Sequence, residues 1–235
     1  MYKFLKKTGI LLVMGIIGLS TAQAASWDED NAPPAGSYVT AEGTPAPHQG
    51  FYVGLEGGGT WLTSQDYGQG VTLQSKPGYN GGITFGYDYK WFRIEEELNA
   101  ARNGADTLDI SGFPSIGLDG HTTSYSAMTN AIFNLRCNTG FGVFAGVGIG
   151  GSGIDYNYQS TAASKAGLNS NSTWKGAVTA QALGGFSYSF NPTVELDLEY
   201  RFVNGFVVNS DIGGGNSIPD YRTNNVDLGL KFFLT

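Results

Sequence analysis

The chain is poor in cysteine, in basic residues and in long apolar segments. Its 235 residues include a single cysteine, Cys137. An exported protein held together by disulfides carries an even set of cysteines, so this fold must be stable without them. We interpret Cys137 as an incidental residue of a short turn, and an intermolecular disulfide is the alternative.

The longest apolar run lies at the start of the chain, from Gly9 to about Leu19. Three lysines precede it, and the small-x-small sequence Ala22-Gln23-Ala24 follows it. About a dozen apolar residues are too few for a spanning helix, which needs roughly 20. We therefore predict that residues 1–24 are a cleaved signal peptide, rather than an uncleaved anchor helix. Without another long apolar run, the chain could span a membrane only as a closed sheet.

Basic residues are scarce beyond this signal. Residues 1–24 hold three of the 13 basic residues and none of the 20 acidic ones, which leaves 10 against 20. Nucleic-acid binding needs a basic surface, so we expect no nucleic-acid partner. Residues 25–50 are acidic, rich in proline and without periodicity, which predicts a flexible tail.

From Phe51 onward, apolar and polar residues alternate with a period of two. The alternating segments are residues 51–63, 79–88, 91–101, 123–135, 141–153, 174–190, 194–203 and a last one that ends with Val226 to Leu234. Segments of about ten residues with this alternation are typical of membrane barrel strands.

The connections alternate in length, which supports the same fold. Short ones lie at residues 88–90, 136–139 and 191–192, and long ones at 64–77, 102–122, 155–173 and 204–221. Aromatic residues gather near both ends of the segments, as expected at two membrane interfaces. We predict that residues 51–235 form an all-β, eight-stranded antiparallel transmembrane β-barrel with short periplasmic turns and long external loops.

One face of the predicted strands is polar and would line the lumen. Its charged members are Glu56, Arg93, Glu95, Glu97, Glu195, Asp197, Glu199, Arg201 and Lys231. An eight-stranded barrel is only wide enough for side chains, so we expect these charges to pair and fill it. Acids outnumber bases, so a hydrated lumen would prefer cations.

Glu96 breaks the alternation, because it falls in the lipid-facing phase of the third segment. A charge at mid-bilayer is costly. A bulge, a protein contact or a neutral carboxyl group would each resolve the conflict.

No residue set points to catalysis or to metal or cofactor binding. The strand alternation already explains the spacing of the carboxylates. The two histidines, His48 and His121, fall in the tail and in a long loop, and neither lies in a strand beside a serine. We therefore expect no enzyme, no cofactor and no metal.

Several segments resemble the small surface-antigen barrels of the opacity-protein-like and OmpA-like type. They are Phe51-Tyr52-Val53-Gly54-Leu55-Glu56-Gly57, Gly81-Gly82-Ile83-Thr84-Phe85-Gly86-Tyr87, Arg93-Ile94-Glu95, Ala145-Gly146-Val147-Gly148-Ile149-Gly150, residues 194–202 and residues 226–232. The resemblance implies a surface-exposed outer-membrane protein of a Gram-negative bacterium, often an antigen, and no enzyme. Some relatives are adhesins and others form narrow pores.

Three functions follow as hypotheses. The first is a surface protein, embedded in outer-membrane lipid, that presents its loops to a host receptor or matrix, as an adhesin does. The second is a narrow, cation-preferring pore. The third is a secreted soluble barrel that binds a small ligand, but that class places its apolar residues inside.

Overall fold

The computed structural model describes residues 49–66, 71–137, 139–161, 171–207 and 221–234. The predicted signal peptide, all but the last two residues of the predicted tail, and His48 lie outside these residues. Within the described ranges, no helix is long and apolar enough to cross a membrane.

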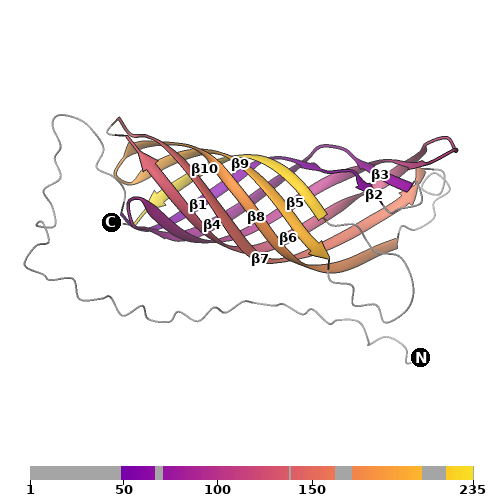
Figure 1. The fold of residues 1–235 in the computed structure, drawn as a ribbon, viewed down its shortest axis with the longest axis horizontal. Helices are drawn as coiled ribbons and strands as arrows, with labels where there is room; N and C mark the ends of the chain where they lie inside the picture. The colour runs from indigo at the N-terminus through magenta and orange to yellow at the C-terminus, as the bar shows by residue number, and fades with distance from the viewer. Residues whose placement is uncertain (1–48, 67–70, 138, 162–170, 208–220, 235) are drawn as a thin grey trace, which may run out of the picture. The chain divides into compact units, whose positions relative to one another are not determined.

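Eight antiparallel strands close into a barrel (Figure 1). In ring order they are β5 (Phe92–Ile110), β4 (Gly78–Asp88), β1 (Gly50–Leu62), β10 (Tyr221–Phe233), β9 (Val194–Val207), β8 (Asn171–Asn191), β7 (Phe141–Ser160) and β6 (Ile116–Arg136). Pairing of β5 with β6 closes the ring, so the barrel wall has no free edge. The predicted eight-stranded antiparallel fold is confirmed.

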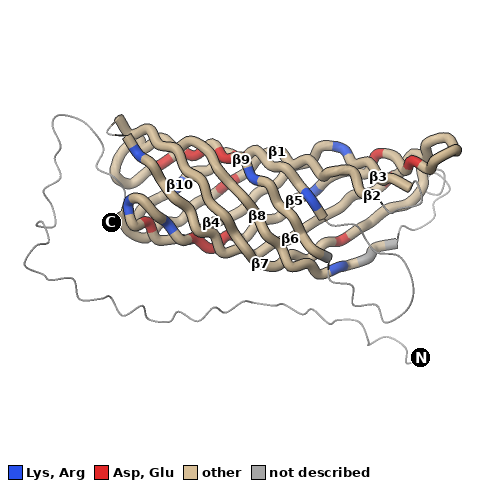
Figure 2. Tube along the Cα trace, viewed as in Figure 1, with Lys and Arg blue, Asp and Glu red and all other residues tan. Residues whose placement is uncertain are grey.

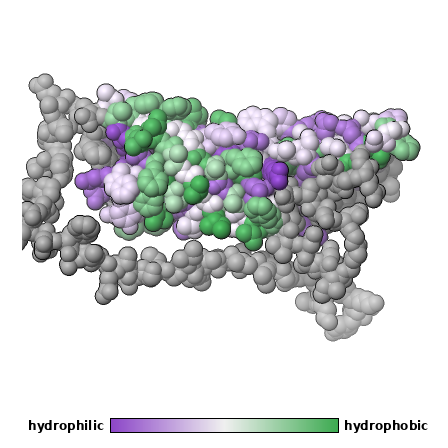
Figure 3. All heavy atoms as spheres, in the orientation of Figure 1, coloured by the Kyte–Doolittle hydropathy of each residue, from purple (hydrophilic) through white to green (hydrophobic). Residues whose placement is uncertain are grey.

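The barrel is apolar outside and polar inside. On β9, Glu195, Asp197 and Glu199 are buried, whereas Leu196 and Leu198 between them are exposed. On the face seen in Figure 3, patches of hydrophobic residues accordingly lie over the barrel. A soluble ligand-binding barrel has the opposite arrangement, so the third hypothesis does not fit this fold.

Exposed aromatic side chains mark both rims of the apolar surface. Near the short turns they are Phe51, Tyr89, Phe141, Phe190 and Phe232. Toward the long connections they are Trp61, Tyr79, Tyr125, Trp174 and Phe202. These two belts correspond to the membrane interfaces of a spanning barrel.

The strands extend well beyond the second belt, which the sequence did not predict. Residues 102–122 were expected to be a loop, but β5 runs to Ile110 and β6 begins at Ile116. Two further strands, β2 (Gln65–Asp66) and β3 (Val71–Ser75), continue the sheet, with β3 pairing against β5. We call β2, β3 and residues 103–122 the strand extension; it lies at the right in Figure 1.

The prediction of a loop was wrong because it rested on the composition of the segment alone. Residues 102–122 are rich in glycine, serine, threonine and aspartate, which are common in loops. Here β3 and β6 supply partners for the backbone of β5, and a register shift between Gly104 and Thr107 accommodates the irregular segment.

Candidate functional site

Charged side chains fill the lumen. Within the described ranges, those that face it include the acids Glu56, Asp88, Glu95, Glu97, Glu195, Asp197, Glu199 and Asp227 and the bases Arg93, Arg136, Arg201 and Lys231. We call these twelve residues the lumen network. Its eight acids face four bases, and charged positions of both signs recur along the barrel strands (Figure 2).

Arg201 is the centre of the part of the network that lies farther from the short turns. Its Nη2 atom lies 2.8 Å from Glu56 Oε2 and 2.8 Å from Glu199 Oε1, and its Nη1 atom contacts Glu97. Asp227 Oδ2 lies 3.7 Å from Nη2. The Arg201 side chain is 2% exposed, so these contacts form away from bulk water.

Neutral amides complete the surroundings of Glu97. Asn130 Nδ2 and Gln181 Nε2 donate hydrogen bonds of 2.9 and 2.8 Å to Glu97 Oε2. Asn99 Nδ2 donates to Glu56 Oε1 over 3.0 Å. A buried carboxylate is tolerated when its oxygens are paired and hydrogen-bonded in this way.

Arg93 and Lys231 organise a second group, closer to the short turns. Arg93 lies 3.5 Å from both Glu195 and Asp197, and Lys231 contacts Asp197. The Arg93 guanidinium also lies 4.7 Å from the centre of the Phe144 ring, which fits a cation–π contact. The charged residues proposed from the sequence therefore fall into two adjoining clusters.

The sequence prediction left out three members of the network: Asp227, and the pair Arg136 and Asp88, which close the network at the short-turn end. Arg136 Nη2 lies 2.7 Å from Asp88 Oδ2 and 3.0 Å from Glu195 Oε2. Arg136 was assigned to a turn, but it is the last residue of β6. Extending the alternation that places Asn134 inside by two residues would have found it.

The lumen has little free space. A cavity lined by residues including Glu56, Glu199 and Asp227 has a volume of about 10 Å³, which is room for about one water molecule. Toward the long-loop end, an apolar cluster of buried inward-facing residues adds to the packing: Leu62, Ile154, Tyr156, Ala177 and Tyr221. Among the described residues, the interior around this cavity is therefore filled by charged and amide side chains.

His121 lies in β6 instead of in a loop, and its Nδ1 atom is 3.1 Å from Arg102 Nη2. Over the described ranges, no group of three histidine, cysteine, aspartate or glutamate residues is arranged to hold a metal ion.

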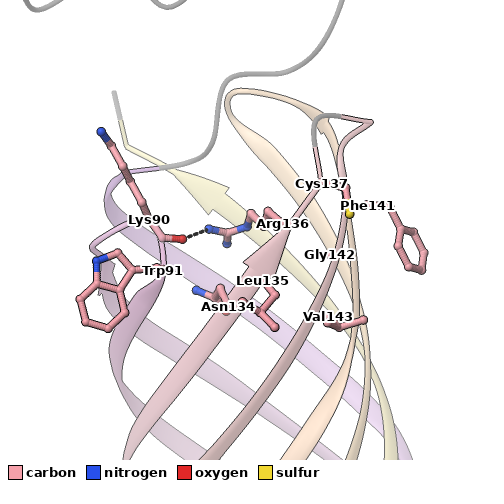
Figure 4. Close-up of a pocket in the computed structure, with 9 residues that line it drawn as sticks. All are labelled: Lys90, Trp91, Asn134, Leu135, Arg136, Cys137, Phe141, Gly142 and Val143. Atoms are coloured by element: carbon pink, nitrogen blue, oxygen red, sulfur yellow. Dashed lines mark hydrogen bonds between the residues drawn. The ribbon is translucent and has the colours of Figure 1, made fainter. Parts of the chain in front are cut away.

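A larger pocket of about 390 Å³ lies at the short-turn rim (Figure 4). Leu135, Phe141 and Val143 are among its lining residues, and Arg136 Nη1 donates a 3.1 Å hydrogen bond to the Lys90 carbonyl beside it. Because these apolar side chains are exposed on the outside of the barrel, the pocket belongs to the lipid-facing surface.

Glu96 faces outward, as its place in the alternation predicted. Thr129 Oγ1 on β6 donates to its two carboxylate oxygens over 2.9 and 3.0 Å. The register between β5 and β6 is regular from Phe92 to Gly104, so no bulge turns Glu96 inward.

Comparison with known proteins identifies the family of this barrel. Residues 10–232 match the family described as outer membrane protein beta-barrel domain. Among solved structures, Neisserial surface protein A is similar with 18% identity, a TM-score of 0.52 and coverage of 78% of this chain and 97% of its own. The outer membrane protein OprG from Pseudomonas aeruginosa has 14% identity, a TM-score of 0.51 and coverage of 80% and 98%. No curated protein sequence matches the chain.

Proposed function

Since the chain belongs to the outer membrane protein β-barrel family and is located in the outer membrane, we propose that it acts there as a surface protein whose strand extension binds a partner outside the cell. The observation that carries this proposal is the combination of a packed lumen with strands that continue past the membrane belt. The part of the molecule that offers contact surface is therefore the extension.

The extension is long enough to reach beyond the lipid headgroups. Beyond Arg102, where pairing with β4 ends, β5 continues for eight residues to Ile110. At about 3.3 Å per residue, this is up to roughly 26 Å along the strand. The hydrophobic colouring of the barrel thins over this region (Figure 3), as expected for a surface that faces water.

The tip of the extension carries exposed apolar side chains. Phe113, in the turn between β5 and β6, is 72% exposed, and Ile116, the first residue of β6, is 41% exposed. Ser111 precedes both residues, and Ser115 lies between them. An aromatic side chain with polar neighbours is a common anchor of protein interfaces. We propose this tip as the contact point for a host receptor or matrix protein.

The test compares bacteria that display the wild-type chain with bacteria that display F113S/I116S. Binding to cultured epithelial cells and to immobilised matrix proteins should fall about tenfold, since loss of a buried aromatic anchor typically costs more than about 1 kcal/mol. The matched control S111A/S115A changes the same turn but keeps the apolar pair and should bind normally. Equal binding by F113S/I116S, or no binding by the wild type, would exclude this contact.

A narrow cation-preferring pore is the second candidate, favoured by the excess of acids in the lumen network. Ions would need the Arg201 contacts to open, so we expect rare conductance events in planar bilayers. If they occur, E97Q/E199Q should reduce the preference for cations. Unchanged selectivity in that variant would count against the pore.

A further inference from the structure

Glu96 lies halfway between the two membrane interfaces. It pairs in register with Thr129, four residues from the pair Phe92–Phe133 and four residues from the pair Ala100–Tyr125. At about 3.3 Å per residue, each interface is roughly 13 Å away along the strand. Neither end of the barrel is therefore within reach of the Glu96 side chain.

The surroundings of Glu96 on this face are otherwise apolar. Its register partner on β4 is Phe85, and Ile94 and Leu98 flank it on β5. The hydroxyl of Thr129 supplies one proton, whereas a carboxyl group offers about four acceptor positions. The Glu96 carboxyl thus retains hydrogen-bonding capacity that hydrocarbon cannot satisfy.

Ionisable residues at such depths generally mark a protein contact or a pathway. Because Glu96 points away from the lumen, a pathway through the barrel does not use it. We propose that Glu96 and Thr129 form the centre of an interface with a second copy of this chain, through the wall made by β5 and β6.

Self-complementarity identifies the occupant as a second copy. In hydrocarbon a carboxyl group is stable in its neutral form, which both donates and accepts a hydrogen bond. A two-fold interface brings the same group from each copy to the axis, so two Glu96 side chains satisfy each other. Ala127 and Ala131, on either side of Thr129 along β6, are short enough for the two walls to approach closely.

The native Cys137 provides a reporter for this interface. It is exposed one residue beyond β6, the strand that carries Thr129. Cys137 labelled with donor or acceptor maleimide dyes would be reconstituted in phospholipid vesicles at low protein density. We expect energy transfer that falls when unlabelled wild-type protein is added in excess.

Three variants decide the outcome. E96L should weaken association about tenfold, which is the scale of a hydrogen bond between membrane-embedded segments. E96Q should retain association, because an amide also donates and accepts. L228A is the matched control, since Leu228 faces lipid on the opposite wall, where β10 pairs with β9.

Heat-shifted migration on gels would verify that each variant is folded before energy transfer is compared. Transfer in E96L equal to wild type would overturn the proposal, as would a loss in E96Q as large as in E96L. Absence of transfer in the wild-type protein, or a loss in L228A equal to that in E96L, would also overturn it.

Discussion

Replacing Arg201 by methionine should strongly destabilise the barrel. The side chain lies within 2.8 Å of Glu56 and Glu199 and contacts Glu97, and it is almost fully buried. Methionine fills a similar volume but leaves these carboxylates without their shared cation. Removing one partner of a buried ion pair costs about 3–5 kcal/mol, and we expect R201M to lower the free energy of unfolding by that amount.

Urea unfolding in phospholipid vesicles, followed by fluorescence of the four tryptophans, would measure this change. The control R102M removes an exposed arginine whose Nη2 lies 3.1 Å from His121, and it should cost less than about 1 kcal/mol. In R201M/E97Q/E199Q, two of the acids that lose their contact with Arg201 are replaced by neutral amides, so part of the stability should return. An R201M barrel that unfolds within about 1 kcal/mol of the wild type would refute the idea that Arg201 neutralises its neighbours.

Further predictions concern individual positions. A Cβ atom at Gly58 would lie 1.9 Å from a backbone oxygen of β10, so G58V should abolish the heat-shifted gel band. A Cβ atom at Gly176 would have no neighbour within 4 Å, so the control G176A should keep that band. Tyr52 donates a buried 2.6 Å hydrogen bond to Glu95, so Y52F should lower the free energy of unfolding in urea by about 1–3 kcal/mol. Unchanged stability would mean that water replaces the hydroxyl. Cys137 is exposed, so it should react with a polar maleimide without denaturant, as mass spectrometry would show.

Alternation predicted which side chains face the lumen because side chains of a strand change face at every residue. It placed Glu195 and Arg201 inside and Glu96 outside; in the structure Glu195 and Arg201 are buried, and Glu96 is exposed. The pattern carries this information locally, so no knowledge of the neighbouring strands was needed.

Contacts between strands depend on distances that the sequence does not contain. Strand tilt and stagger set which side chains meet across a barrel. The alternation therefore could not predict which charges meet: Arg93 lies beside Asp197, whereas Arg201 lies beside Glu97. The β3–β5 pairing of the strand extension was missed for the same reason, since it joins segments that are distant in the chain.

The arrangement of the Arg201 contacts bears on how slowly the barrel comes apart. Arg201 is 145 residues from Glu56 and 104 residues from Glu97, and the three residues lie on β9, β1 and β5. Their contacts form only when distant parts of the chain have come together, which happens late in folding. Interactions that are absent from the transition state mainly slow unfolding. The lumen network should therefore slow unfolding of the closed barrel more than it speeds folding, and so contribute mainly to its kinetic stability.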